Sequence, residues 1–186
     1  MTAWFQKKDA ETEASKEAAP KPSGRQANGV SFSQLLGDDT ILIAPAGLDK
    51  TGLLETLVVR LCEARSLPDR QALLAKVLER EQGISTTLDT GLSLPHARVE
   101  GISQIVAALA LVPHGIADPK QPGLTIRVMF LFFSPNKPEA FSLHLQLLRG
   151  VASLFQSSLI ERLSHAPSPA EALALLRAQE TQGSPS

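Results

Sequence analysis

Three side chains in the central part of the sequence are of types that suit chemistry on an anionic group: Arg80, His96 and His144. A neutral imidazole carries one free lone pair, and its ordinary pKa of ~6.5 leaves it mostly unprotonated near neutral pH. Pro95 restricts the backbone just before His96 and helps to fix the direction of the ring. A guanidinium binds anionic oxygens, and a second imidazole can donate a hydrogen bond to one. These residue types predict a nucleophile at His96 with a cation and a donor to assist it.

The motifs around His96 follow a fixed order along the chain. They are Arg80-Glu81, Ser85-Thr86, a turn containing a glycine, Leu94-Pro95-His96 and, later, His144-Leu145 followed by Leu147-Leu148. This order resembles the phosphorylation-site signature of enzyme IIA domains of the bacterial phosphoenolpyruvate-dependent phosphotransferase system, of the fructose, mannitol and nitrogen types. The resemblance extends from about Leu35 to Leu176, because the order of helices and strands also fits.

The resemblance implies a role for each of these side chains. His96 would be the catalytic residue that accepts a phosphoryl group, Arg80 would bind the phosphate, and His144 would support the site. The donor would be a histidine-phosphorylated carrier protein of the HPr type, and the acceptor a sugar permease domain or a regulatory protein. No cofactor and no metal is implied. Arg98 is left open between a solvated side chain and one that meets a partner's phosphate.

The sequence departs from the family pattern at three positions. Thr87 and Asp89 stand where glycines are common, and Ala97 stands where glycine commonly follows the histidine. Side chains there restrict φ and add bulk, and Asp89 adds a negative charge that could repel a phosphate. Backbone N–H groups of the loop 85–91 could donate to the phosphate oxygens. The sequence therefore does not fix the rate of phosphoryl transfer.

Other functions are alternatives to the phosphocarrier. The serious alternative is a regulatory binding module with the same fold that docks to kinases, transporters or transcription regulators. The Asp-Thr-Gly at 89–91 occurs in aspartic proteases, but those folds are nearly all β, whereas helical patterns surround this motif. A zinc site from His96, His114 and His144 would need three separate segments to converge. His114 and His165 are expected at the surface.

Composition places the chain among ordinary globular proteins. It has 186 residues, a formal net charge of -1 and 43% hydrophobic residues, so a core is available and no general attraction to nucleic acid is indicated. Cys62 is the single cysteine, which excludes an internal disulfide. No apolar run reaches the ~20 residues of a membrane span, so we expect a cytoplasmic protein without direct membrane insertion.

Three segments are expected along the chain. Residues 1–29 and 181–186 are predicted to be disordered tails around an enzyme IIA-like domain at 30–180, since residues 7–29 contain no apolar side chain larger than alanine. Within the domain, strands are predicted at 41–43 and within the loop that ends at Pro95. Buried strands are predicted at 105–112 and 125–133.

Helix signals fill the remaining parts of the domain. Asp49 is expected to cap one helix, and Gly83 to end a second that has Pro68 near its first turn. Pro138 opens a long helix, and Ser168 begins the last one. The residues between the two long strands, rich in proline and glycine, are expected to form a loop. The class is α/β, a mixed sheet between helices.

Overall fold

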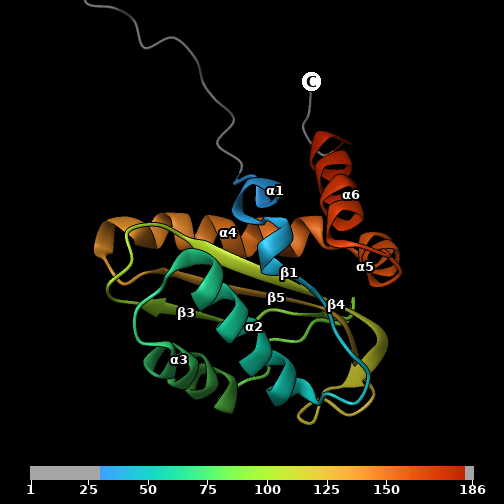
Figure 1. The fold of residues 1–186 in the computed structure, drawn as a ribbon, viewed down its shortest axis with the longest axis horizontal. Helices are drawn as coiled ribbons and strands as arrows, with labels where there is room; N and C mark the ends of the chain where they lie inside the picture. Colours follow the sequence, from blue (N-terminus) through green and yellow to red (C-terminus); the bar gives the residue numbers. More distant parts are fainter. Residues whose placement is uncertain (1–29, 183–186) are drawn as a thin grey trace, which may run out of the picture.

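A mixed sheet lies between two layers of helices in the computed structural model, which describes residues 30–182 (Figure 1). The predictions for the tail at 1–29 and for residues 183–186 lie outside the described residues. The strands are β1 (Ile41–Ile43), β2 (Leu92–Ser93), β3 (His96–Val99), β4 (Val106–Ala117) and β5 (Thr125–Pro135). The helices are α1 (Phe32–Leu35), α2 (Lys50–Arg65), α3 (Arg70–Gln82), α4 (Phe141–Leu154), α5 (Ser157–Ser164) and α6 (Pro169–Gln182), with short 3-10 helices at Asp38–Thr40 and Pro138–Ala140.

The sheet is built around an antiparallel pair, β4 and β5. The strand β1 runs parallel to β4 on one side. On the other side, β2 and β3 follow one another along the same edge of β5, both parallel to it. Leu92 pairs with Val128, and His96 pairs with Phe132. The start of β3 therefore lies beside the second half of β5.

Both faces of the central strands are buried, which explains their unbroken apolar sequences. One face carries Leu109 and Phe130 and packs with α1, α4, α5 and α6; the other carries Ala110 and Leu131 and packs with α2 and α3. Figure 1 shows these two helical layers on opposite sides of the strands. The predicted fold class, a mixed sheet sandwiched by helices, is confirmed.

Side chains at the helix ends explain where the helices begin. The Asp49 carboxylate accepts a hydrogen bond from the N–H of Gly52 at 2.7 Å, so this aspartate caps α2 as expected. Helix α3 begins at Arg70 with Asp69 as its cap, so Pro68 precedes the cap and is not in the first turn. At the last helix, Ser168 Oγ accepts from the N–H of Glu171 at 3.2 Å.

The loop expected after residue 112 is wrong in its first part, because β4 continues to Ala117. The register jumps from Leu111 opposite Val128 to Ile116 opposite Ile126, so the intervening residues bulge out of the ladder. Pro113 lies in this bulge, where its missing N–H costs no ladder hydrogen bond. Proline and glycine here mark an irregularity within a strand.

The remaining differences are at short or terminal elements. Helices α1 and α5 were not predicted, and α6 extends through Gln182, two residues into the segment expected to be a tail. Within the described residues, no helix is long and apolar enough to cross a membrane.

Candidate functional site

His96 is the first residue of β3, and its ring is held on two sides. Its Nδ1 lies 2.8 Å from the carbonyl oxygen of Leu94, and its ring stacks on Phe132 with centroids 5.3 Å apart and planes 8° apart. A carbonyl only accepts, so the neutral ring must carry its hydrogen on Nδ1. The lone pair is then on Nε2. The fold thus fixes both the direction of the ring and the nitrogen available for attack.

The protonation of His96 also favours a nucleophile. Burial lowers the pKa of His96 below its usual value, and the charge of Arg80 lowers it further, against opposing contributions from Leu94 and Glu81. The ring is therefore neutral at pH 7. A neutral ring with a free Nε2 can attack an electrophile without first losing a proton.

His144 lies next to His96, as the helical position of the residue predicted. The two ring centroids are 5.6 Å apart, and His144 is buried in α4. Its Nδ1 lies 2.7 Å from Ser134 Oγ. Burial, together with the charges of His96 and Arg98, lowers the pKa of His144 to about 4. When the Ser134 hydroxyl donates to Nδ1, the hydrogen of this neutral ring is on Nε2, where it can be donated to an anion.

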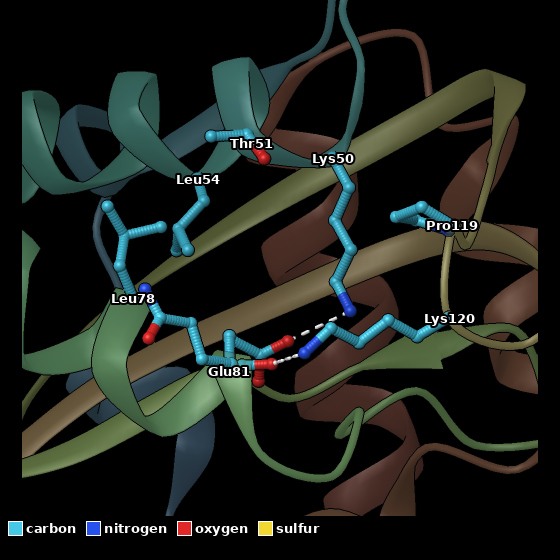
Figure 2. Close-up of a pocket in the computed structure, with 8 residues that line it drawn as sticks. Lys50, Thr51, Leu54, Leu78, Glu81, Pro119 and Lys120 are labelled. Carbon is cyan, nitrogen blue, oxygen red and sulfur yellow. Dashed lines mark hydrogen bonds and ion pairs between the residues drawn. The ribbon is translucent and has the colours of Figure 1, made fainter.

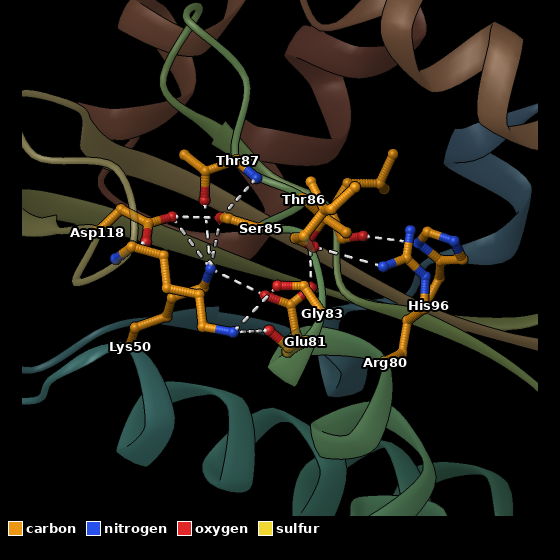
Figure 3. Close-up of polar contacts among 12 residues, drawn as sticks. Lys50, Arg80, Glu81, Gly83, Ser85, Thr86, Thr87, His96 and Asp118 are labelled. Carbon is orange, nitrogen blue, oxygen red and sulfur yellow. Dashed lines mark hydrogen bonds and ion pairs between the residues drawn. The ribbon is translucent and has the colours of Figure 1, made fainter.

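Cationic side chains line a groove of about 570 Å³ that contains His96 and His144. Lys76, Arg80 and Arg98 contribute positive charge to it, and Glu79 is the acidic residue of the lining. Arg80 Nη1 donates to the carbonyl of Ile84 at 3.4 Å, and the guanidinium lies beside the His96 ring in Figure 3. The groove therefore offers an anion several charge-assisted donors around the free imidazole nitrogen.

Arg98 is tied to the wall of this groove. Its Nη2 donates to the carbonyl oxygen of Lys137 at 2.8 Å, and its guanidinium lies 5.1 Å from the centre of the Phe141 ring. Arg98 is therefore held at the groove by its own contacts, whichever of its two predicted roles applies. Phe141 itself remains 47% exposed, so an apolar surface adjoins the groove.

A buried ionic cluster lies behind Arg80. Lys50 Nζ lies 2.8 Å from Glu81 Oε2 and 3.0 Å from Asp118 Oδ2, and it donates to Ser85 Oγ at 3.1 Å (Figure 3). Burial alone would raise the pKa of Asp118, but hydrogen bonds from Ser85, Thr87, the Lys120 N–H and Lys50 outweigh it and hold the pKa well below the usual range. Asp118 is thus ionised throughout the physiological pH range.

The three departures from the family pattern cause no backbone strain. Thr87, Asp89 and Ala97 are not among the described non-glycine residues with positive φ, and the turn before β2 uses Gly91, whose φ is 89°. Asp89 is exposed in that turn. Asp89 precedes β2, and Leu92 at the start of β2 pairs with a β5 residue four positions, or ~13 Å, from the partner of His96.

Three N–H groups of the loop 85–91 are bonded within the loop and its hairpin. The N–H of Leu88 donates to the carbonyl of Leu92, that of Gly91 to the carbonyl of Leu88, and that of Thr87 to Ser85 Oγ. These donors stabilise the hairpin that leads into β2. These three N–H groups are therefore not free to donate to an anion.

The remaining histidines lie apart from this site. His114 is exposed in the bulged part of β4, whose Pro113 carbonyl accepts from Arg127 at the far end of β5. His165 is exposed after α5 and bonds to the carbonyl of Glu161. Both surface positions were predicted. Three histidines therefore do not converge on a zinc site, and the described part of the chain has no cluster suited to a metal.

Comparison with known proteins decides the family. Residues 34–179 match the family model described as phosphoenolpyruvate-dependent sugar phosphotransferase system, EIIA 2. The chain belongs to this enzyme IIA family. Membership confirms the resemblance inferred from the motifs and gives the chain a phosphocarrier or regulatory role as a component of a phosphotransferase system.

Relatives of this enzyme IIA chain include a regulatory protein and a component of a sugar-specific system. A nitrogen regulatory protein of Pseudomonas aeruginosa is 28% identical over 147 residues, covering 77% of this chain and 92% of the relative. A fructose-specific EIIA component of Haloferax volcanii is 29% identical over 120 residues, covering 64% and 77%. The crystal structure of the nitrogen regulatory protein IIA-Ntr from Neisseria meningitidis aligns with a TM-score of 0.66 at 25% identity, covering 77% of this chain and 97% of that one.

Sequence reasoning found the three side chains of the groove but missed what surrounds them. Lys50 and Asp118 were not considered, nor was Phe132, which lies under the imidazole. One signal was available for Lys50. It occupies the first position of α2, where the helix dipole disfavours a cation, so a lysine there needs a carboxylate partner.

Proposed function

We propose that this enzyme IIA protein is a phosphocarrier that accepts a phosphoryl group on Nε2 of His96 from a histidine-phosphorylated carrier protein. The single observation that carries the proposal is the hydrogen bond between His96 Nδ1 and the Leu94 carbonyl, 2.8 Å long, because it leaves Nε2 unprotonated and facing the groove's cations. The family supplies the reaction class, and this geometry supports His96 as the acceptor.

The proposed step forms one bond and breaks one. The Nε2 lone pair of His96 attacks phosphorus, the P–N bond to the donor's histidine breaks, and the electron pair of that bond returns to the donor's ring. The hydrogen on Nδ1 of His96 stays with the Leu94 carbonyl throughout. Passing the group onward reverses these roles, so the phosphoryl group needs no metal or nucleotide held by this chain.

Three groove side chains would stabilise the transferred group. Arg80 binds phosphoryl oxygens by charge-assisted hydrogen bonds, and Arg98 contributes a second guanidinium held against Phe141. His144, neutral at pH 7, donates through Nε2 without adding a charge that would trap the product. The acceptor would be a sugar permease domain or a regulatory protein in the cytoplasm.

Regulation is the second candidate, favoured by the match to a nitrogen regulatory protein over 92% of that relative's length. In this function the loaded and unloaded forms of the groove would be read by a docked regulator, transporter or kinase. Both candidates use phosphorylation of His96, and they differ in the acceptor. A purely docking module would bind its partner without becoming phosphorylated.

Intact-mass measurement with purified enzyme I, a histidine-containing carrier protein and phosphoenolpyruvate tests the proposal. The wild type should gain one phosphoryl group that is stable in alkali and lost in acid, as a P–N bond requires. His96→Ala should keep its fold and lose the label. Undiminished labelling of His96→Ala would move the acceptor elsewhere, and an unlabelled wild type would favour the docking module.

A further inference from the structure

Lys50 lies where three parts of the chain meet: the start of α2, the stretch from the end of α3 into the following hairpin, and the loop after β4. Its side chain is 9% exposed, and its ammonium contacts Glu81 from α3, Ser85 and Thr87 from the hairpin before β2, and Asp118 from the loop after β4. Ser85 Oγ donates in turn to Asp118 Oδ2 at 2.6 Å. Figure 2 shows the lysine reaching from the start of α2 toward Glu81, across a pocket of about 250 Å³.

The first arm of this cluster fixes the end of the helix that carries Arg80. Glu81, the next residue, is held by Lys50 through Oε2 and by the Thr86 hydroxyl through Oε1 at 2.5 Å. The Lys120 ammonium also bonds to the Glu81 and Gly83 carbonyls, which are left unpaired at the helix end. The last turn of α3 therefore has little freedom to rotate Arg80 away from the groove.

The second arm fixes the hairpin that leads into His96. Ser85 and Thr87 are both bonded to Lys50, and between them the carbonyl of Thr86 accepts from the N–H of Leu94 at 3.1 Å. Leu94 is the residue whose own carbonyl orients the His96 ring. One lysine thus reaches the phosphate-binding side chain through one arm and the phosphoryl acceptor through the other.

We propose that Lys50 is a positioning residue for phosphoryl transfer, which holds Arg80 and His96 at their working separation through its contacts with Glu81, Ser85, Thr87 and Asp118. The inference rests on the proposed function of His96. Lys50 lies outside the groove lining and touches neither imidazole, so it acts through other residues. Its positive charge also neutralises Glu81, a carboxylate whose field reaches His96 and would otherwise oppose an arriving phosphoryl group.

The test compares four full-length proteins in transfer from a histidine-phosphorylated carrier: the wild type, Lys50→Met, Lys50→Arg and Leu57→Ala. Leu57 is fully buried on the same helix about two turns after Lys50, roughly 10 Å along the helix axis, so its truncation is the control for simple destabilisation. A misplacement near 1 Å costs up to about a hundredfold in rate, so Lys50→Met should lower kcat by about tenfold to a hundredfold. The KM for the donor should stay within about twofold, because the docking surface is untouched.

The controls separate positioning from stability. Well below its melting midpoint, Leu57→Ala should transfer at the wild-type rate, and Lys50→Arg, which keeps the charge, should recover part of the loss. Wild-type kcat in Lys50→Met, or an equal loss in Leu57→Ala, would overturn the proposal. Should Lys50→Met not fold, Glu81→Gln keeps the side-chain shape and the Lys50–Asp118 pair. A wild-type kcat in Glu81→Gln would then overturn it instead.

A spectroscopic readout keeps this proposal distinct from the phosphocarrier function. Ring ¹⁵N chemical shifts should show one His96 tautomer, with hydrogen on Nδ1, in the wild type and a mixture in Lys50→Met, as the Leu94 carbonyl loses its fixed position. A wild type that does not become phosphorylated would refute the phosphocarrier function. The ring ¹⁵N chemical shifts would still show whether Lys50 positions His96. An unchanged single tautomer in Lys50→Met would refute the positioning role.

Discussion

At the scale of single residues, the site depends on keeping two imidazoles neutral with different nitrogens exposed. His96 presents a lone pair on Nε2 because Nδ1 donates to a carbonyl. His144 contacts a hydroxyl, which can donate as well as accept, so its Nε2 can carry the hydrogen. One ring is thus suited to attack and the other to donation, although both are histidines that line the same groove.

Arg80→Ala should slow phosphoryl transfer much more than it destabilises the protein. A charge-assisted hydrogen bond contributes about 1.5–3 kcal/mol, which corresponds to roughly a tenfold to hundredfold loss of rate if the bond forms in the transition state. Arg80 is exposed and donates only one long hydrogen bond to the Ile84 carbonyl, so the free energy of unfolding should change by less than about 0.5 kcal/mol. Single-turnover kinetics and urea unfolding measure the two effects. Normal kinetics with a large stability loss would make Arg80 structural.

His144→Gln should leave His96 able to accept the phosphoryl group but weaken its support. Glutamine keeps a donor of similar reach, so labelling should persist at a lower rate or with faster hydrolysis. Rapid-quench labelling and the half-life of the phosphorylated protein report these changes. Mapping the phosphoryl group onto His144 in the wild type would reverse the two roles.

At the scale of elements, the sequence was informative wherever the signal was local. The Asp49 cap and the two buried strands were predicted correctly, because capping side chains and apolar runs act within a few residues. The bulge in β4 was missed because Pro113 gives the same signal in a bulge as in a loop. Lys50 and Asp118 are 68 residues apart, and no periodicity relates them, so their ion pair could not be read from the chain.

The turn that aligns β2 with β5 provides a test at this scale. Gly91 has φ +89°, and a Cβ there would lie 3.2 Å from the carbonyl oxygen of Thr125. Gly47 has the same φ with nothing within 4 Å, so it is the matched control. Both alanine variants should lose about 1–2 kcal/mol for the left-handed conformation. In chemical denaturation, Gly91→Ala should lose more free energy of unfolding than Gly47→Ala. Equal losses would show that Thr125 moves aside without cost.

At the scale of the whole molecule, the charged interior is divided between two regions that respond to different pH ranges. Asp118 lies in the Lys50 cluster on the α2–α3 side of the sheet, and the pKa of its carboxyl lies well below the usual range. Its contribution to stability is therefore present above its ordinary pKa and is lost only in strong acid. His144 lies in the groove and titrates at higher pH. Measuring the free energy of unfolding at a series of acidic pH values therefore distinguishes the two regions.

The free energy of unfolding should fall as the pH drops from about 6.5 to about 4, before Asp118 of the Lys50 cluster is protonated. The pKa of His144 is about 4 in the folded protein against an ordinary ~6.5, so in this window the unfolded chain binds a proton that the folded chain does not. The stabilisation from such a group is fully present above pH ~6.5. A lowering of the pKa by this amount contributes about 3 kcal/mol to the free energy of unfolding. Solvent screens this contribution little, because His144 is only 6% exposed. His96, whose pKa is also lowered, adds in the same direction.

Urea unfolding at a series of pH values measures this slope. His144→Gln should remove most of the decline between pH 6.5 and 4, because glutamine does not titrate. The pH-dependent part of the difference in stability between the variant and the wild type should shrink toward pH 4, where the buried imidazole is half protonated, and vanish at lower pH, where it is charged in both states of the wild type. An identical slope in His144→Gln and the wild type would show that the acid sensitivity arises elsewhere, and that His144 is not held neutral by its burial against His96 and Arg98.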